Sequence, residues 1–239
     1  MKGCVGAIDG IIIKTRCPTL KEDSQPRRFF CARKHCFGLN AQATCDSIGK
    51  FTDADISFPS SAGDSLAHRS SDLGMQLEEG LLPEWAWLNG DAAYCNSNYM
   101  MTPVSGTAAS MGIWADSYNY QQSSIRMPIE CAFGMLVRRW GVLWRPLECR
   151  MDRWASIVTC CMRLHNICID YHVVLSEGLP LDGCFTVNKK RVDTRPLLDR
   201  DGNPVGIFTD DQHRPVADGT SRRDALIASI KTQGLVRPN

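Results

Sequence analysis

The stretch CVGAIDGIII, residues 4–13, carries one carboxylate, Asp9, in the middle of an apolar run. Short runs rich in Ile and Val are typical of a buried β-strand, and we predict a strand over residues 3–13. A charge inside such a strand is costly unless other groups compensate it. What Asp9 does therefore depends on which other carboxylates the fold brings to the same place.

The bulk composition bounds the class of protein. The chain has 239 residues, of which 44% are hydrophobic and 22% are charged, values ordinary for a soluble globular protein of one or two domains. A net charge of +1 means that any nucleic-acid surface must be local. No apolar run reaches the roughly 20 residues that span a bilayer, and the first residues lack a signal-peptide pattern. We therefore expect a nuclear or cytoplasmic protein that is not secreted and has no membrane partner.

The sequence contains 12 cysteines and no CxxC pair. Without a secretory signal, we expect reduced thiols that are mostly buried as small apolar side chains. Cysteine and histidine gather over residues 31–36 and again over residues 160–168, but neither cluster has the spacing of a zinc site. We therefore do not expect zinc.

The first half of the chain shows the order of elements typical of an α/β layer. We predict strands over residues 36–46 and 51–58, a helix over 64–80, a fourth strand over 85–94, and irregular structure over 95–124. Asp64 is the candidate N-cap of the first helix.

Two later helices are predicted from their apolar stripes. Residues 129–140 carry apolar side chains at offsets 0, 3, 4, 7, 8 and 11, the spacing of one buried helical face. The next helix begins near Asp152 as N-cap and continues to Cys168. Residues 173–239 are charged and turn-rich, so we expect a poorly structured C-terminal tail with one short helix at 224–232.

Two further carboxylates can reach the edge of the sheet where Asp9 lies. Asp91 ends the fourth predicted strand, and Glu130 lies on the flank of the apolar stripe of its helix. Carboxylates that gather without basic partners repel one another and usually hold hard divalent cations such as Mg²⁺ or Mn²⁺. Two such cations can activate water or a 3′-hydroxyl at a phosphodiester.

Each of these residues also has an ordinary structural explanation. Asp9 and Asp91 precede turns, where aspartate often forms or caps the turn. Glu130, considered alone, has the features of a solvated helix residue. A chain with 26 acidic residues always offers some triple of this kind, and three more aspartates compete for the same roles, Asp46, Asp55 and Asp64.

The motifs taken together resemble the Harbinger-type DDE transposases. The matching strings follow one another in unbroken order over residues 3–172: VGAIDG, FGLNAQATCD, DSLAHRSSDLG, WLNGDAAY, MTP, SYNYQQSSIR, IECAFGMLVRRWGVLWRPL and RLHNICID. The resemblance implies an α/β fold of the RNase H-like type, a mixed sheet flanked by helices. The endonuclease domain would then occupy residues 1–172, followed by the tail of residues 173–239.

Carried over position by position, the resemblance places a catalytic triad on Asp9, Asp91 and Glu130. It implies that these residues hold two divalent cations, Mg²⁺ or Mn²⁺, with Asp9 bridging both, and that the substrate is a DNA phosphodiester. It also implies a Myb-like DNA-binding protein as partner, and a homodimer where two DNA ends are handled together.

Three departures from the family pattern support an alternative function. Relatives carry a longer N-terminal region with a helix-turn-helix segment, whereas Met1 here stands close to the first strand. Gly63 stands where relatives have His before Asp64, and Pro128 lies two residues before Glu130, where it can shift the start of the helix. In this alternative, a truncated or domesticated copy is a DNA- or protein-binding module without catalysis.

Several other residues invite an interpretation. Candidates for DNA phosphate contacts, or simply solvated charges, are Arg27, Arg28, Arg33, Lys34, His35, Arg126, Arg138 and Arg139. Lys189, Lys190 and Arg191 form a short basic cluster of the kind found in nuclear localisation signals. We expect His165 and Asn166 to pack or cap a helix rather than to act in catalysis.

Overall fold

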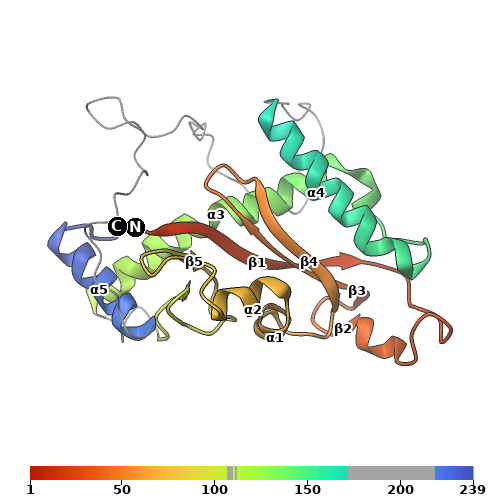
Figure 1. Ribbon diagram of the computed structural model, residues 1–239, viewed down its shortest axis with the longest axis horizontal. Coiled ribbons are helices and arrows are strands. Elements are labelled where there is room, and N and C mark those ends of the chain that lie inside the picture. Colours follow the sequence, from red (N-terminus) through yellow and green to blue (C-terminus); the bar gives the residue numbers. More distant parts are fainter. Residues whose placement is uncertain (107–109, 111, 172–218, 239) are drawn as a thin grey trace.

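The computed structural model describes residues 1–106, 110, 112–171 and 219–238, which form an α/β fold with a mixed sheet flanked by helices (Figure 1). The strands are β1 (Cys4–Lys14), β2 (Phe30–Cys31), β3 (Cys36–Cys45), β4 (Phe51–Pro59), β5 (Trp87–Asn89) and β6 (Met100–Met101). The helices are α1 (Asp64–Arg69), α2 (Asp72–Glu78), α3 (Ile113–Arg139), α4 (Trp154–Asp170) and α5 (Gly219–Thr232), and three 3-10 turns are η1 (Pro26–Phe29), η2 (Gly141–Leu143) and η3 (Met151–Arg153). The predicted α/β class with a mixed sheet and the first three predicted strands are thus confirmed, whereas the fourth strand, predicted over residues 85–94, covers only Trp87–Asn89.

Strand β1 is the centre of the sheet. It pairs antiparallel with β3 and parallel with β5, while β3 pairs antiparallel with β2 and β4, and β5 pairs parallel with β6. The β1–β5 pairing stops at Ala7 and Asn89. Asp9 therefore stands just beyond the end of β5, and the chain that leaves β5 passes the same edge of the sheet with Asp91.

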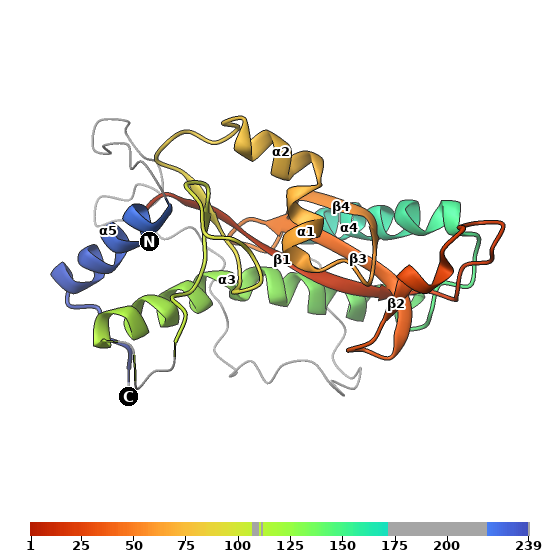
Figure 2. The same ribbon diagram turned by 90° about the horizontal axis from the view of Figure 1, so that it is seen from below.

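Alternate side chains of the sheet build two separate apolar cores. The larger core lies between the sheet and helices α3 and α4, and its members include Ala7, Ile13, Ala43, Phe51, Ile129, Phe133, Trp154 and Val158. The smaller core lies on the opposite face, against α2, and is formed by Ile8, Leu77, Leu88, Tyr94 and Met100. Figure 2 shows α3 along one side of the sheet and α1 and α2 along the other. Residues of one strand that differ by one position therefore face different helices.

Helix α3 is longer than the sequence predicts. Irregular structure was expected over residues 95–124, but the helix begins at Ile113. Tyr118 and Gln122 are completely buried in this first half, so tertiary packing overrides the weak helix propensity of the segment. Pro128 lies inside the helix and does not mark its start. An interior proline destabilises a helix by about 3 kcal/mol, and in α3 the burial of side chains in both halves of the helix offsets this cost.

Two predicted N-caps are wrong. Asp64 is the first residue of α1, and Gly63 holds the cap position. The Asp64 carboxylate instead turns toward β3, where it accepts hydrogen bonds from two side chains. The helix predicted from Asp64 is divided into α1 and α2, and Ser71 caps the second. Asp152 lies in η3, and α4 begins at Trp154.

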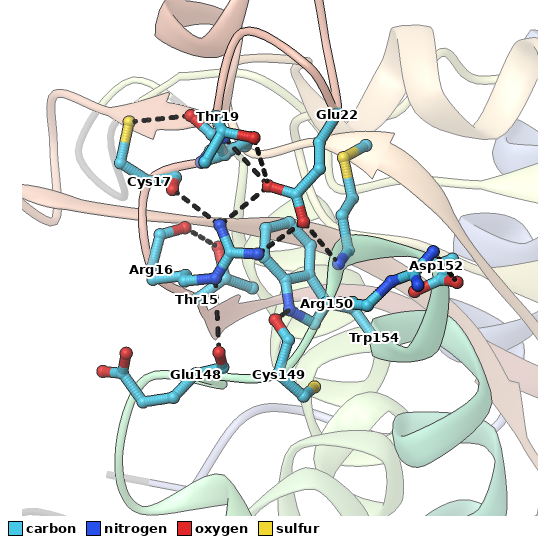
Figure 3. Close-up of polar contacts among 12 residues, drawn as sticks. Thr15, Arg16, Cys17, Thr19, Glu22, Glu148, Cys149, Arg150, Asp152 and Trp154 are labelled. Atoms are coloured by element: carbon cyan, nitrogen blue, oxygen red, sulfur yellow. Dashed lines mark hydrogen bonds and ion pairs between the residues drawn. The ribbon is translucent and has the colours of Figure 1, made fainter.

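The loop after β1 is fastened to the start of α4 (Figure 3). Glu22 forms an ion pair with Arg16 and accepts hydrogen bonds from the backbone N–H groups of Thr19 and Met151, at 2.9 and 3.1 Å. The Arg16 guanidinium lies over the Trp154 ring, 5.7 Å from its centroid. The hydrogen bond from Arg16, followed by those from the backbone, holds the pKa of Glu22 well below its usual range. This network packs on the larger core through Trp154, which is one of its members.

Helix α5 docks on the segments that flank β5. Arg222 is buried and donates hydrogen bonds to the backbone carbonyls of Glu84, Ala86 and Asn98. Its guanidinium also lies over the Trp87 ring, 5.5 Å from the centroid. The last described residues therefore stabilise the end of the sheet where β5 runs.

The predicted C-terminal tail is described only in part. The short helix expected at 224–232 lies within α5. The basic cluster at residues 189–191 and the rest of the predicted tail up to residue 218 lie outside the described residues. In the part of the chain that the structure describes, no helix is long and apolar enough to cross a membrane.

The expectation that most cysteines are buried is wrong for the described ones. Only Cys31, Cys45 and Cys161 are buried, while Cys17, Cys95 and Cys160 are exposed. The exposed thiols lie in the loops after β1 and β5 and on the outer side of α4, where no second layer covers them.

Candidate active site

Asp9 lies on the face of the sheet that α3 covers. Its Oδ1 accepts a hydrogen bond from the backbone N–H of Gly10 at 2.8 Å, and its Oδ2 is 3.9 Å from Nη2 of Arg126 on α3. The side chain is 22% exposed, so it is largely shielded but can be reached from solvent.

Glu130 joins Asp9 through the same guanidinium. Arg126 and Glu130 are four residues apart on α3, and Nη2 of Arg126 is 3.1 Å from Oε1 of Glu130. The Glu130 side chain is 36% exposed, which agrees with its predicted place on the flank of the apolar stripe. One arginine thus stands between the first and third predicted catalytic residues.

Asp91 lies two residues beyond β5 and also interacts electrostatically with Asp9. Its Oδ1 accepts a hydrogen bond from the backbone N–H of Ala93 at 2.8 Å, so it forms the turn that the alternative explanation anticipated. The turn is held from α3, because Gln122 donates a hydrogen bond to the carbonyl of Gly90. A turn-forming role and a place beside Asp9 are therefore compatible.

A fourth carboxylate, Asp64, approaches from the opposite face of the sheet. Its Oδ1 accepts hydrogen bonds from Asn40 Nδ2 at 3.0 Å and from Gln42 Nε2 at 2.8 Å, and Tyr94 donates its hydroxyl to Gln42 Oε1 at 2.6 Å. Gly10 makes this approach possible, since a Cβ there would lie 2.3 Å from Asp64 Oδ1. The glycine after Asp9 therefore provides space for the Asp64 network rather than a turn.

The electrostatics of the site follow from this crowding. Burial, with smaller contributions from the nearby charges of Asp91 and Asp64, raises the pKa of Asp9 to about 6, against the opposing effects of the Gly10 N–H and of Arg126. Burial and the same carboxylates also raise the pKa of Tyr94 strongly, which keeps its hydroxyl protonated as a donor. The site therefore carries more negative charge than its single guanidinium neutralises.

The donor atoms of this site suit a hard divalent cation. They are carboxylate oxygens, the ligands that Mg²⁺ and Mn²⁺ prefer, and they come from a strand, a turn and a helix that the core holds in place. Within the described ranges, however, no three acidic, histidine or cysteine side chains are grouped closely enough to hold a metal as they stand. Arg126, positioned between Asp9 and Glu130, accounts for this spacing.

The other predicted residues have different surroundings. Asp46 accepts hydrogen bonds from the backbone N–H groups of Ile48 and Lys50, so it forms the turn before β4. Asp55 accepts hydrogen bonds from the backbone N–H and the hydroxyl of Ser57, on an exposed part of β4. Neither aspartate is among the groups that interact with Asp9.

The prediction for His165 and Asn166 is confirmed as far as packing is concerned. His165 is fully buried, with Nε2 3.0 Å from the carbonyl oxygen of Gly49. Asn166 accepts from the backbone N–H of Phe51 and donates to its carbonyl, at 2.8 and 2.7 Å. Both side chains attach α4 to the β3–β4 hairpin.

Four residues around the carboxylates have contacts that the sequence did not predict: Arg126, Asn40, Gln42 and Tyr94. Arg126 was named only as a candidate phosphate contact, although its spacing of four from Glu130 on a helix was a usable signal. Asn40 and Gln42 alternate with apolar residues in the string GLNAQAT, and two amides on one face of a strand indicate a polar partner above it. For Tyr94, the sequence contained no such signal.

Comparison with known proteins agrees with this geometry. A family model described as DDE superfamily endonuclease matches residues 8–166, a range that includes Asp9, Asp91 and Glu130. Searches of curated proteins and of solved structures gave no match. Because the family model covers about two thirds of the chain, this protein belongs to the DDE superfamily endonucleases.

Proposed function

We propose that this protein is a divalent-metal-dependent DNA endonuclease of transposase descent, of the Harbinger type and with an RNase H-like domain over residues 1–172. The observation that carries the proposal is the convergence of Asp9, Asp91 and Glu130 on one edge of the sheet, from three separate elements. The mixed sheet, with three antiparallel and two parallel strand pairings and β1 taking part in one of each kind, supports the RNase H-like architecture.

Asp9, Asp91 and Glu130 would hold two cations, Mg²⁺ or Mn²⁺. When bound, such cations activate water or a 3′-hydroxyl and stabilise the leaving oxygen at a phosphodiester. The contribution of the chain is to fix the carboxylates from a central strand, a braced turn and a long helix. Partial burial of Asp9 also limits the water that competes for its oxygens.

The remaining parts of the proposal concern partners and location. DNA is the substrate, a Myb-like protein is a candidate for target recognition, and a homodimer would serve two DNA ends. The exposed residues Arg27, Arg33 and Lys34, in and after η1, are available for phosphate contacts. We propose a nuclear location, because the substrate is there.

Plasmid nicking tests the catalytic part of the proposal. Supercoiled plasmid is incubated with the purified protein and Mn²⁺ or Mg²⁺, beside the variants Glu130→Gln and Asp55→Asn, the second serving as a control away from the site. We expect nicking that requires metal, survives in Asp55→Asn and falls at least a hundredfold in Glu130→Gln. Equal nicking by the wild type and Glu130→Gln would point to a contaminating nuclease and reject the proposal.

One observation favours the non-catalytic alternative. The described residues contain no ready metal site, since Arg126 lies between Asp9 and Glu130. If a well-folded sample binds DNA but neither binds Mn²⁺ nor nicks plasmid, a DNA-binding module is the better description. Mn²⁺ binding and plasmid nicking thus decide between the two functions.

A further inference from the structure

Arg126 occupies a position that a structural ion pair does not explain well. Its side chain is 13% exposed, and Nη2 is 3.1 Å from Glu130 but 3.9 Å from Asp9. Within the described part of the chain, its buried Nε finds no hydrogen-bond partner. A buried guanidinium usually satisfies its donors, so this arrangement is only partly optimised.

The charges around Arg126 are unequal. Asp9 interacts electrostatically with Asp91 and Asp64 as well as with Arg126, and Glu130 adds a further carboxylate on α3. One guanidinium pairs with the carboxylates of Asp9 and Glu130, while Asp91 and Asp64 add negative charge near Asp9, and a doubly charged cation there would neutralise more charge in less volume. A metal and Arg126 therefore compete for the same oxygen atoms.

We infer that Arg126 is an internal counter-ion of the carboxylate site, which a divalent cation displaces and which then pairs with a DNA phosphate. The inference rests on the proposed function and assigns a positioning role to a residue outside the triad. Arginine keeps its charge at any physiological pH, so it can leave the carboxylates only by moving the guanidinium as a cation. The planar guanidinium matches phosphate oxygens, and DNA at the cleavage site brings phosphates to this flank of α3.

The inference couples metal binding to DNA binding. Metal frees Arg126 for the phosphate, and a phosphate that holds Arg126 leaves the carboxylates open for metal. By thermodynamic linkage, each ligand should raise the affinity for the other by the same factor. Without metal, Arg126 reduces repulsion among the carboxylates and holds the site in a closed form.

A Mn²⁺ titration followed by isothermal calorimetry tests the first half of the inference. The full-length chain is compared with Arg126→Gln and with Arg163→Gln, a control at an exposed position on α4. We expect Arg126→Gln to bind Mn²⁺ about tenfold more tightly than the wild type, since a competing charge is removed at close range. Structural damage by the substitution would weaken Mn²⁺ binding, whereas removal of a competing charge would strengthen it. The direction of the change in Mn²⁺ affinity therefore separates these two causes. Equal or weaker Mn²⁺ affinity in Arg126→Gln would overturn the inference.

Fluorescence anisotropy of a labelled DNA duplex tests the second half, with Ca²⁺ as a divalent cation for binding measurements. In the wild type, Ca²⁺ should raise DNA affinity and increase the salt dependence by about one phosphate contact. In Arg126→Gln, Ca²⁺ should raise DNA affinity several-fold less and leave the salt dependence unchanged. The same gain in both proteins would refute a phosphate role for Arg126.

The plasmid assay keeps this test separate from the proposed function. If the wild type nicks plasmid but Arg126→Gln shows no tighter Mn²⁺ binding, only the counter-ion role fails. If the wild type neither binds Mn²⁺ nor nicks plasmid, the proposed function and the counter-ion role fail together.

Discussion

At the residue scale, the carboxylate of Asp9 sits on a central strand where burial raises its pKa from an ordinary value of 3.8 to about 6. The folded protein thus binds this proton more tightly than the unfolded chain. The corresponding stability is fully present below about pH 4 and is lost as the pH rises through 6. A difference of about two pKa units corresponds to roughly 3 kcal/mol.

Asp9→Asn should therefore stabilise the metal-free protein at pH 8, by up to about 3 kcal/mol, and this gain should nearly vanish at pH 4. Urea unfolding at pH 4, 6 and 8 measures the difference, with Asp152→Asn as an exposed control that changes little. Nicking activity should be lost in the same variant, because the proposed metal ligand is removed. At this position, a gain in stability is therefore expected to accompany a loss of function. A destabilised Asp9→Asn at pH 8 would mean that the Arg126 interaction outweighs the cost of burial.

Asp9, Asp91 and Glu130 could be proposed from the sequence because each lies in a recognisable string, whereas the groups that contact them could not. Arg126 meets Asp9 only after α3 packs along β1, and Asp64 reaches Gly10 only because α1 turns back over β3. Such contacts depend on tertiary geometry that a linear pattern does not contain.

At the scale of elements, α4 is attached to the β3–β4 hairpin by two side chains. Asn166 satisfies both backbone groups of Phe51, and His165 contacts the carbonyl of Gly49. Asn166→Ala would leave the N–H and the carbonyl of Phe51 without their partner in a partly buried place. We expect a loss of about 2 kcal/mol in the free energy of unfolding.

Hydrogen exchange checks this prediction in a second way. The amide of Phe51 should exchange faster in Asn166→Ala, while Asn166→Asp, which keeps the acceptor but not the donor, should give an intermediate effect on stability. Arg163→Gln on the same helix is the matched control. An unchanged Phe51 amide would show that the hairpin is held by packing alone.

Elements with a strong apolar pattern were predicted well, and those held by tertiary contacts were not. β1, β3 and β4 appear close to their predicted ranges, since each strand carries its own signal. The first half of α3 lacks such a pattern and becomes helical because Tyr118 and Gln122 are buried against the rest of the fold. The same helix then carries Arg126 and Glu130 to the sheet.

At the scale of the whole molecule, the edge of the sheet that carries the candidate site is held by a distant part of the chain. Arg222 on α5 binds the carbonyls of Glu84, Ala86 and Asn98, on both sides of the strand that leads to Asp91. Arg222→Met would keep much of the packing over Trp87 but leave these partly buried carbonyls without the Arg222 donor. We expect a loss of about 3 kcal/mol in stability, since hydrogen bonds to a charged group are among the stronger ones.

The same substitution should also affect the site, because the braced segment carries Asp91. Arg222→Met should bind Mn²⁺ several-fold more weakly than Lys231→Gln, an exposed control on the same helix, when both are measured well below their unfolding temperatures. Weaker metal binding with intact folding would show that α5 belongs to the functional unit of the endonuclease. Loss of stability without any change in Mn²⁺ affinity would instead mean that α5 supports the fold while the turn at Asp91 is held from α3, through the bond from Gln122 to Gly90.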